Sequence, residues 1–393
     1  MCAEADLAVV GGGIVGLAIA RTFARRSSGR VVVFEKERDV ALHQSGRNSG
    51  VLHSGLYYRP GSRKARLAVR GRALVEEALD AAGLSWIRTG KVVVAVDQSE
   101  VPRLDELERR GRANGVPLRR VDADGLRQLE PHARGVAALH VETTGVTDYA
   151  ALARAWAREL EETGHELAMG THVLAVEPDG DAALVRTATG EHRARRAIVA
   201  AGLFADRVAR ASGVPNPQTL LPFRGEYWEL AADVRHLCRG LIYPVPDPTF
   251  PFLGVHLSRT VDGRVLGGPS AVPAFAREGY SKREARLSGV LEAARSKGFR
   301  RLAAGHWRTG AAELWRSFSK ASFARALARL VPDVEARHLI PAPAGVRAQA
   351  VLDDGSLADD FLIERHGPVL HVLNAPSPAA TASLAIAEEV LAM

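Results

Sequence analysis

The chain has 393 residues, of which 47% are hydrophobic and 25% charged, and its formal net charge at pH 7 is +7. This length allows two or three domains with buried cores, and the composition is that of an ordinary globular protein. No apolar run reaches the roughly 18 residues that a transmembrane helix requires. The first predicted strand begins at Asp6, so we expect no signal or transit peptide. Cys2 and Cys238 cannot form a disulfide framework and no metal-ligand spacing occurs, so we expect no metal and a reducing, cytoplasmic location.

Residues 6–16 (DLAVVGGGIVG) predict a short buried strand over 6–10 that runs into a glycine-rich turn. The turn matches the pattern G-x-G-x-x-G through Gly11, Gly13 and Gly16, and residues 14–26 have the composition of a helix. In such a unit the glycines permit a tight turn, close approach of the backbone to a pyrophosphate, and close packing of helix on strand. The pyrophosphate would bind at the helix N-terminus, where free N–H groups favour negative charge.

A second predicted strand, residues 30–34 (RVVVF), ends at Glu35. A carboxylate at this place can accept hydrogen bonds from a ribose 2′-OH, as in NAD or FAD, and would repel the 2′-phosphate of NADP. The glycine pattern alone also fits a turn that binds nothing. Strand, glycines, helix, second strand and acid in this order favour dinucleotide binding.

The stretch 42–62 (LHQSGRNSGVLHSGLYYRPGS) is rich in small and polar residues. Its hydroxyl and backbone N–H groups suit a phosphate or the edge of a flavin. A flexible surface loop is the alternative, but it would not need His53 between apolar and aromatic neighbours, so we favour a cofactor or substrate role for this histidine.

Helical composition predicts helices over 63–82, 101–114 and 150–163, the last capped by Asp148, and a pair of strands falls around 86–96. The helices over 101–114 and 150–163 are most simply structural. Residues 196–205 (RAIVAAGLFA) predict a buried strand that ends in small residues, where a side chain would collide with a bound cofactor.

The run EKERDVALHQSGRNSGVLHSGLYYRPGSRKARL (35–67) resembles the FAD-binding start of the L-2-hydroxyglutarate oxidase/dehydrogenase family, within the D-amino-acid-oxidase-like flavoproteins. A sequence similar to VLHSGLYY also occurs in FAD-dependent glycerol-3-phosphate dehydrogenases. LLPFRGEYWEL (220–230), the segment 242–271 and NAPSPAATASLAIAEEVL (374–391) also resemble the L-2-hydroxyglutarate family, so the likeness extends from residue 6 nearly to the C-terminus.

The resemblance implies FAD, whose ADP half would bind at the glycine turn while the loop around His53 approaches the isoalloxazine. We expect noncovalent binding; covalent attachment through His53 is the alternative. The N-terminus of the last helix would face the flavin pyrimidine ring and stabilise the negative charge of reduced flavin. The expected cofactor-binding residues are Gly11, Gly13, Ile14, Val15, Gly16, Glu35, Lys36, Gln44, Ser45, Asn48, Ser49, Gly50, Val51, Val173, Ala201, Gly202, Gly345, Arg347, Asn374, Ser377, Pro378 and Ala379.

The predicted fold is a doubly wound α/β, Rossmann-like FAD domain with an inserted, mainly antiparallel β substrate domain. The FAD domain is discontinuous and takes residues 1–85, 146–215 and 340–393. The substrate domain takes residues 86–145 and 216–339.

The expected reaction is FAD-dependent oxidation of an L-2-hydroxy acid, L-2-hydroxyglutarate to 2-oxoglutarate being the favoured case. Arg347 would bind the carboxylate in a bidentate manner, and His256 is the first choice for the base because imidazole titrates near neutral pH. His53 is the second choice, or a residue that orients substrate and flavin. Weaker candidates for substrate contact are Tyr58, Tyr243 and Arg224.

Two other functions remain open. One is oxidation of an amino acid or of a hydroxylated intermediate of secondary metabolism on the same scaffold, and the other is a flavin-binding protein without turnover. Oxygen and quinone are both open as the final electron acceptor, and nothing resembles a nucleic-acid-binding module.

Positive charge is concentrated in residues 299–330, which carry seven Lys and Arg residues against one acid, Glu313. Their net charge is +6, against +7 for the whole chain. Trp and Phe residues alternate with the basic ones at helical spacing, which suits peripheral contact with an anionic membrane surface, here its inner face. The alternative, which we favour at this point, is that these helices cover the substrate domain with their arginines solvated.

Overall fold

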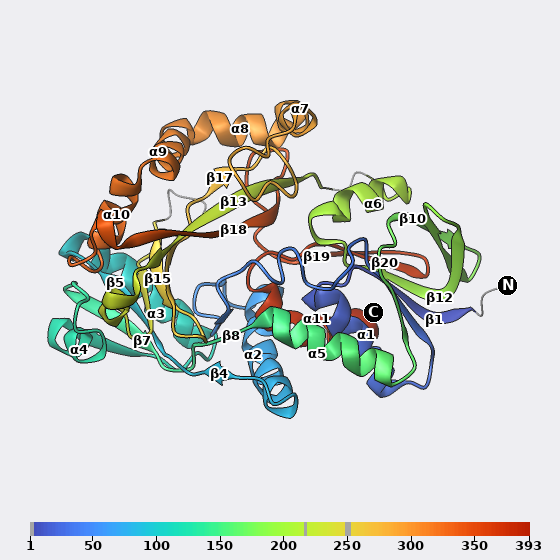
Figure 1. The fold of residues 1–393 in the computed structure, drawn as a ribbon, viewed down its shortest axis with the longest axis horizontal. Coiled ribbons are helices and arrows are strands. Elements are labelled where there is room, and N and C mark those ends of the chain that lie inside the picture. Colours follow the sequence, from blue (N-terminus) through green and yellow to red (C-terminus); the bar gives the residue numbers. More distant parts are fainter. Residues whose placement is uncertain (1–3, 216–217, 248–252) are drawn as a thin grey trace.

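The computed structural model describes residues 4–215, 218–247 and 253–393, and two large sheets dominate it (Figure 1). Part of the segment 242–271 therefore lies outside the described residues. The sheet on the right of Figure 1 belongs to the FAD domain, and the sheet on the left to the substrate domain.

The centre of the first sheet consists of parallel strands in the spatial order β20, β12, β1, β2 and β9. Val9 pairs with Val33 on one side and Ile198 on the other, and such apolar runs are typical of strands buried on both faces. The hairpin of β10 and β11 extends the sheet beside β12, and β19 pairs antiparallel to β20. The bounds are β1 (Ala5–Val10), β2 (Val31–Phe34), β9 (Glu166–Ala168), β10 (Val173–Asp179), β11 (Ala182–Thr187), β12 (Glu191–Val199), β19 (Leu362–His366) and β20 (Val369–Asn374).

Four helices cover one face of this sheet and share a single apolar core with it, to which Leu17, Trp156 and Ile386 contribute. The helix α6 packs on the opposite face through Val208, against Val176 and Val185 of the β10–β11 hairpin. The carboxylate of Asp148 accepts hydrogen bonds from the first turn of α5, as predicted. The helices are α1 (Ile14–Arg26), α2 (Arg63–Ala81), α5 (Tyr149–Glu162), α6 (Ala205–Ala211) and α11 (Ala379–Ala392).

The second sheet has the strand order β17, β13, β16, β15, β14, β5, β7 and β6, with β18 paired to β13. All its pairings are antiparallel except β14 with β5, which agrees with the predicted mainly antiparallel domain. The bounds are β5 (Lys91–Ala95), β6 (Arg119–Asp122), β7 (Ala137–Val141), β13 (Leu220–Leu230), β14 (Leu241–Pro244), β15 (His256–Arg259), β16 (Val265–Gly268), β17 (Val272–Pro273) and β18 (Leu339–Ala350).

The strand β18 differs from the prediction, which assigned residues 340–393 to the FAD domain. The strand β18 pairs with β13 from Leu230↔Leu339 to Leu220↔Ala350. Residues 340–350 therefore belong to the substrate sheet and not to the FAD domain. Prolines are rare inside sheets, but among the described strands β18 pairs with β13 alone, and an edge strand tolerates proline.

Helices α3 and α4 pack against the strands β5 and β7 of the second sheet. Helix α10 packs on the same sheet through the buried side chains of Phe323 and Leu327. The helices α7 to α10 run along its outer side, at the upper left of Figure 1. A small three-stranded sheet, β3–β8–β4, joins the two halves. The bounds are α3 (Val101–Ala113), α4 (Ala123–Leu129), α7 (Leu287–Arg295), α8 (Lys297–Gly305), α9 (Trp307–Phe318), α10 (Lys320–Ala328), β3 (Val51–Leu52), β4 (Trp86–Ile87) and β8 (Gly145–Thr147).

We predict that Gly16→Ala lowers the free energy of unfolding by about 1–3 kcal/mol, the usual cost of overpacking a well-packed site. A Cβ atom at Gly16 would lie 2.0 Å from the carbonyl oxygen of Gly11, so helix and turn would have to separate. Chemical denaturation followed by circular dichroism measures the change. Gly310→Ala is the control, because it lies in α9 with nothing within 4 Å of the added atom and should be neutral or stabilising. Equal stability of wild type and Gly16→Ala would contradict this packing argument.

Candidate active site

A cavity of about 1010 Å³ lies between the two sheets and is lined from both domains. It is at the upper end of the size range of ligand sites, which suits a large cofactor together with a small substrate. All the predicted cofactor-binding residues line it except Gly16 and Gly50. Of the predicted catalytic and substrate residues, His53, Tyr58, Tyr243, His256 and Arg347 line it, and Arg224 does not.

At one end of the cavity the strand β1 runs through the glycine turn into α1. Gly11 has φ +112°, and a Cβ atom there would lie 2.5 Å from the carbonyl oxygen of Ala200, so only glycine fits. The N-cap residue Gly13 has no side chain to satisfy the first N–H groups of α1; Ser45 Oγ accepts a hydrogen bond from Ile14 N at 2.8 Å. The helix N-terminus therefore presents positive partial charge to the cavity.

The carboxylate of Glu35 is held beside this turn by the backbone. It accepts hydrogen bonds from Gly12 N at 2.6 Å and from Glu37 N at 2.9 Å, and the side chain is 9% exposed. Among the described residues no Lys or Arg pairs with it. The remaining acceptor capacity of this carboxylate is directed at the cavity that it lines.

At the other end, two histidines and an arginine line the cavity. Gly254 O accepts a hydrogen bond from His256 Nδ1 at 2.8 Å, which leaves Nε2 as an acceptor, and the ring stacks on Tyr243 with centroids 3.8 Å apart. His53 lies in the loop that the sequence singled out, and its backbone N–H donates to Thr381 Oγ1 of α11. Arg347 comes from β18, opposite Phe223.

Burial lowers the pKa of both imidazoles to about 3, and the nearby cations Lys91 and Arg347 act in the same direction. The hydrogen bond to Gly254 O opposes this shift at His256. Both rings are therefore neutral at pH 7 and able to accept a proton. Burial also raises the pKa of the Tyr58 and Tyr243 hydroxyls, so both stay protonated.

The structure corrects the expected substrate contact of Arg224. Its guanidinium pairs with Glu226 at 3.0 Å and donates to the carbonyl of Ser281 at 3.1 Å, away from the cavity. Successive side chains of a strand point to opposite faces. Arg347 lies opposite Phe223 across the ladder, so Arg224, the next residue of β13, projects from the other face.

Gly16 and Gly50 shape the cavity without lining it. Gly16 allows α1 to pack against the Gly11 carbonyl. Gly50 has φ +70°, and a Cβ atom there would lie 2.4 Å from the carbonyl oxygen of Thr147, so it lets the 42–62 loop pass close to β8.

The chain was compared with known proteins. A family model described as FAD dependent oxidoreductase (DAO) matches residues 6–393. The chain belongs to this family of FAD-dependent oxidoreductases. Among curated relatives it is 44% identical to L-2-hydroxyglutarate dehydrogenase of Indibacter alkaliphilus, with 96% of both chains covered. It is 39% identical to L-2-hydroxyglutarate dehydrogenase of Escherichia coli K12 (98% and 92% covered) and 39% identical to the mitochondrial enzyme of Homo sapiens (97% and 86% covered).

Two solved structures share the fold. L-alpha-glycerophosphate oxidase from Mycoplasma pneumoniae with FAD bound superposes with a TM-score of 0.80 at 21% identity, covering 99% of this chain and 94% of that one. Glycine oxidase from Geobacillus kaustophilus gives a TM-score of 0.73 at 21% identity (99% and 94% covered). At this identity the likeness concerns the fold alone.

The residues of this DAO-family chain fit FAD as the cofactor. Gly13, the N-terminus of α1 and Ser45 suit the pyrophosphate, and the Glu35 carboxylate suits ribose hydroxyls. At the far side the N-terminus of α11 opens on the cavity through residues 377–381, and its N-cap residue, Pro378, forms no side-chain cap. This second helix N-terminus can stabilise the charge of a reduced flavin.

Several residues that the sequence did not single out also line the cavity. They are aromatic, basic or amide side chains from both domains, and they include Tyr57, Lys64, Arg110, Tyr227 and Gln349. The tyrosine of EYWEL, Tyr227, accepts a hydrogen bond from Arg347, which fixes the guanidinium. Tyr57 and Lys64 lie within the family-like run 35–67. An aromatic residue and a cation close to His53 in the sequence could have indicated that both line the same site.

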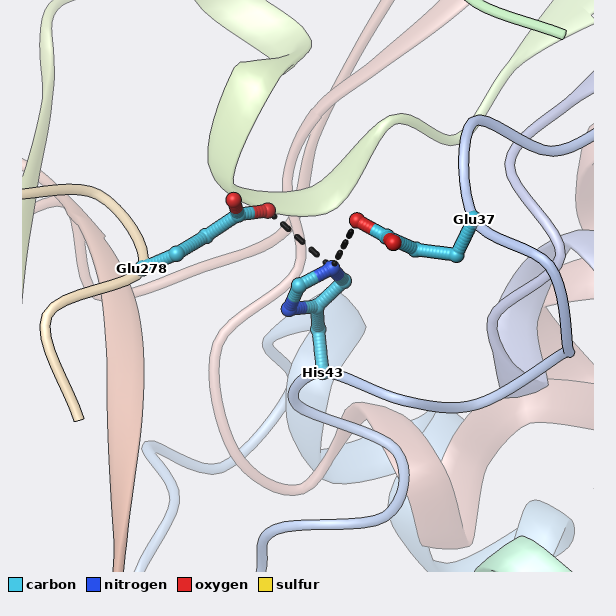
Figure 2. Close-up of side chains that lie close together, drawn as sticks. All are labelled: Glu37, His43 and Glu278. Atoms are coloured by element: carbon cyan, nitrogen blue, oxygen red, sulfur yellow. Dashed lines mark hydrogen bonds and ion pairs between the residues drawn. The ribbon is translucent and has the colours of Figure 1, made fainter. Parts of the chain in front are cut away.

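A polar cluster beside Glu35 joins the two domains (Figure 2). His43 Nε2 lies 3.0 Å from a carboxylate oxygen of Glu37 and 3.0 Å from one of Glu278. The three side chains are close enough to hold a metal ion, but the ammonium of Lys36 forms ion pairs with both carboxylates and lies 2.9 Å from the same nitrogen. Lys36 thus supplies the cation that this group of acceptors requires. Glu278 belongs to the segment between β17 and α7, so the cluster ties the substrate domain to the loop after β2.

We predict that Glu35→Arg weakens FAD binding about 10- to 100-fold, the factor expected from losing hydrogen bonds to a charged group. The change removes the acceptor of the Gly12 and Glu37 N–H groups and places a cation at the ribose site. Titration of apoprotein with FAD, followed by flavin fluorescence, measures the dissociation constant. Glu364→Arg on the exposed side of β19 carries the same charge change and should leave the dissociation constant unaltered.

Proposed function

We propose that this protein oxidises L-2-hydroxyglutarate to 2-oxoglutarate with FAD as the electron acceptor. The observation that carries this proposal is that a neutral imidazole with a free acceptor nitrogen, His256, and a guanidinium, Arg347, line the same cavity as the dinucleotide turn. The 38–44% identity to L-2-hydroxyglutarate dehydrogenases over nearly the whole chain supports the choice of substrate.

Each part of the reaction can be given to a residue of the cavity. Arg347 binds the carboxylate next to the reacting carbon, and Tyr227 keeps the guanidinium in place. His256 Nε2 accepts the proton of the 2-hydroxyl group while Nδ1 stays bonded to Gly254 O, which fixes the tautomer. Bound FAD supplies the acceptor for the hydride that leaves C2.

Substrate binding also improves the base. Burial lowers the pKa of His256 most, and the cations Arg347 and Lys91 lower it further; an anionic substrate beside the ring opposes the effect of these two cations. We therefore propose that the pKa of His256 rises when substrate binds, toward the range in which proton transfer is efficient.

His53 has a positioning role in this proposal. Its Nε2 lies 3.5 Å from Ser377 Oγ, and its backbone is tied to Thr381, so the loop and the start of α11 are held together where the flavin would bind. It remains the second candidate for the base.

We also propose that the segment 299–330 contacts an anionic membrane surface, the inner face in the cell, and that quinone accepts the electrons there. The contact falls on α8 and α9, because Phe323 and Leu327 of α10 are buried on the second sheet. Apolar side chains of α9 point outward: Trp307 is 62%, Trp315 66% and Phe318 71% exposed. The single acid, Glu313, points inward and accepts a hydrogen bond from Ala271 N. The side chain of Arg308 lies outside the described part of the chain.

Solvation of these basic side chains without a membrane stays the alternative, and oxygen stays the alternative acceptor. None of the described helices is long and apolar enough to cross a membrane. The cytoplasmic location stays a prediction.

For the chemistry, we predict that L-2-hydroxyglutarate bleaches the flavin absorbance under anaerobic conditions and that His256→Ala lowers the reduction rate about 10²–10⁴-fold. Arg347→Ala should weaken substrate binding by about 2–5 kcal/mol, because it removes one partner of a buried ion pair. Stopped-flow absorbance on FAD-loaded protein measures both effects.

His236→Ala, an exposed histidine on the far surface, is the control for these variants. A normal rate in His256→Ala together with a large loss in His53→Ala would transfer the base role to His53. Reduction by amino acids and not by hydroxy acids would overturn the proposed substrate.

For the membrane contact, we predict that the protein co-sediments with anionic phosphatidylserine vesicles at low salt and is released at high salt, since each cation near the surface contributes about 1 kcal/mol. The variant Trp315→Ser/Phe318→Ser should bind less at both salt concentrations. No binding to anionic vesicles at low salt would leave the solvated-helix alternative standing.

A further inference from the structure

Lys91 is a charged residue inside an apolar core. It is the first residue of β5 and only 2% exposed. Val93 and Ala95 lie on the same face of β5, and they pack into a buried cluster with Leu104, Leu107 and Tyr243. A cation at such a place costs free energy unless an anion or dipole compensates it.

The ammonium group of Lys91 is compensated by aromatic rings. It lies 4.4 Å from the ring centroid of Tyr57 and 5.1 Å from that of Tyr243. Among the described residues no carboxylate forms an ion pair with it, whereas the ammonium of Lys64 lies 3.7 Å from the Asp359 carboxylate. Burial lowers the pKa of Lys91 to about 7, and no neighbouring acid opposes the shift.

The two tyrosines that hold Lys91 are part of the cavity wall. Tyr243 stacks on His256, and the hydroxyl of Tyr57 is buried without a hydrogen-bond partner among the described residues. Lys91 therefore lies one ring behind the wall at the His256 end. A buried charge beside a cleft, lacking its counter-ion, marks a place that an anionic ligand completes.

We propose that Lys91 is a specificity-determining residue: its charge, behind the wall formed by Tyr57 and Tyr243, selects 2-hydroxy acids that carry a second carboxylate. This inference rests on the proposed function, in which Arg347 takes the carboxylate next to the reacting carbon. The second carboxylate then lies on the Lys91 side of the pocket. Lys91 acts on the substrate through the electrostatic field of its ammonium group and through the two tyrosine rings. It is a positioning residue and takes no part in the proton transfer.

The other groups that face Lys91 do not titrate near neutral pH. Tyr57 comes from the 42–62 loop and Tyr243 from β14, and burial raises the pKa of both hydroxyls. His53 and His256 have pKa values of about 3. On β7 the paired residue is Val141, and on α3 the guanidinium of Arg110 donates to the carbonyl of Tyr57. The other lysine of the cavity wall is Lys64 on α2, whose pKa is also lowered by burial. Lys91, with a pKa of about 7, is the group of this set expected to change charge near neutral pH, and Lys64 requires a control variant.

The test compares two substrates of equal length on the FAD-loaded enzyme: L-2-hydroxyglutarate and L-2-hydroxyvalerate, which has a methyl group in place of the second carboxylate. In Lys91→Met, we expect kcat/KM for the dicarboxylate to fall roughly 10- to 50-fold, mainly through KM, as for removal of a charge several ångströms away in a medium of intermediate dielectric. The value for L-2-hydroxyvalerate should stay within about threefold. Arg158→Met, exposed on α5 and outside the cavity wall, is the matched control and should change neither value.

Two further readouts separate this role from a structural one. Removing an unpaired buried charge should leave the melting temperature unchanged or raise it, and FAD content should be retained. In the wild type, KM for L-2-hydroxyglutarate should rise as the pH passes upward through about 7, because the deprotonated amine no longer attracts the dianion, while KM for L-2-hydroxyvalerate stays flat. A Lys64→Met variant that keeps the wild-type pH profile assigns the dependence to Lys91, even when Lys91→Met does not fold.

Equal losses for both substrates in Lys91→Met, or parallel pH profiles of the two substrates in the wild type, would overturn the role of Lys91 and leave the proposed function intact. No reduction of the wild-type flavin by L-2-hydroxyglutarate would overturn both.

Discussion

The architecture depends on one close approach between backbones, where β1 and β12 end side by side and Gly11 meets the carbonyl of Ala200. Since no side chain separates the two strand ends, the turn after β1 can present its N–H groups to the space beyond the sheet. Everything that lines the cavity from the FAD domain is arranged around this edge. The 42–62 loop passes over it, Glu35 flanks it at the end of β2, and α11 begins beside it.

The second domain completes the site through two long paired strands, β13 and β18. One strand contributes Tyr227 and the other Arg347, so the residue that binds a carboxylate and the residue that holds it in place come from opposite sides of one ladder. A buried ion pair between Arg277 and Asp206, at 2.6 Å, fixes the substrate domain to α6 of the FAD domain. The reacting groups are therefore positioned by contacts between domains as much as within them.

Much of this could be predicted from the sequence, because the decisive signals are local. Glycine spacing, the acid after the second strand and the polar loop around His53 locate the cofactor end, and every residue expected there lines the cavity except Gly16 and Gly50. The errors concern which face or partner a strand takes. Arg224 projects from the face of β13 opposite to the one that Phe223 shares with Arg347, and the expected domain boundary at residue 340 separated β18 from the substrate sheet to which it belongs. The burial of Lys91 could not be predicted, because in a single sequence a lysine before three valines looks the same as the solvated start of a strand.

The contacts of the segment between β17 and α7 also shape the wall of the cavity near Glu35. Glu278 and Tyr280 reach from the substrate domain to Lys36 and to His43, and Arg47 lies over the Tyr280 ring at 4.0 Å. Lys36, His43, Arg47 and Glu278 all line the cavity. The wall at this end is therefore built by both domains, so its shape depends on how the two domains pack together.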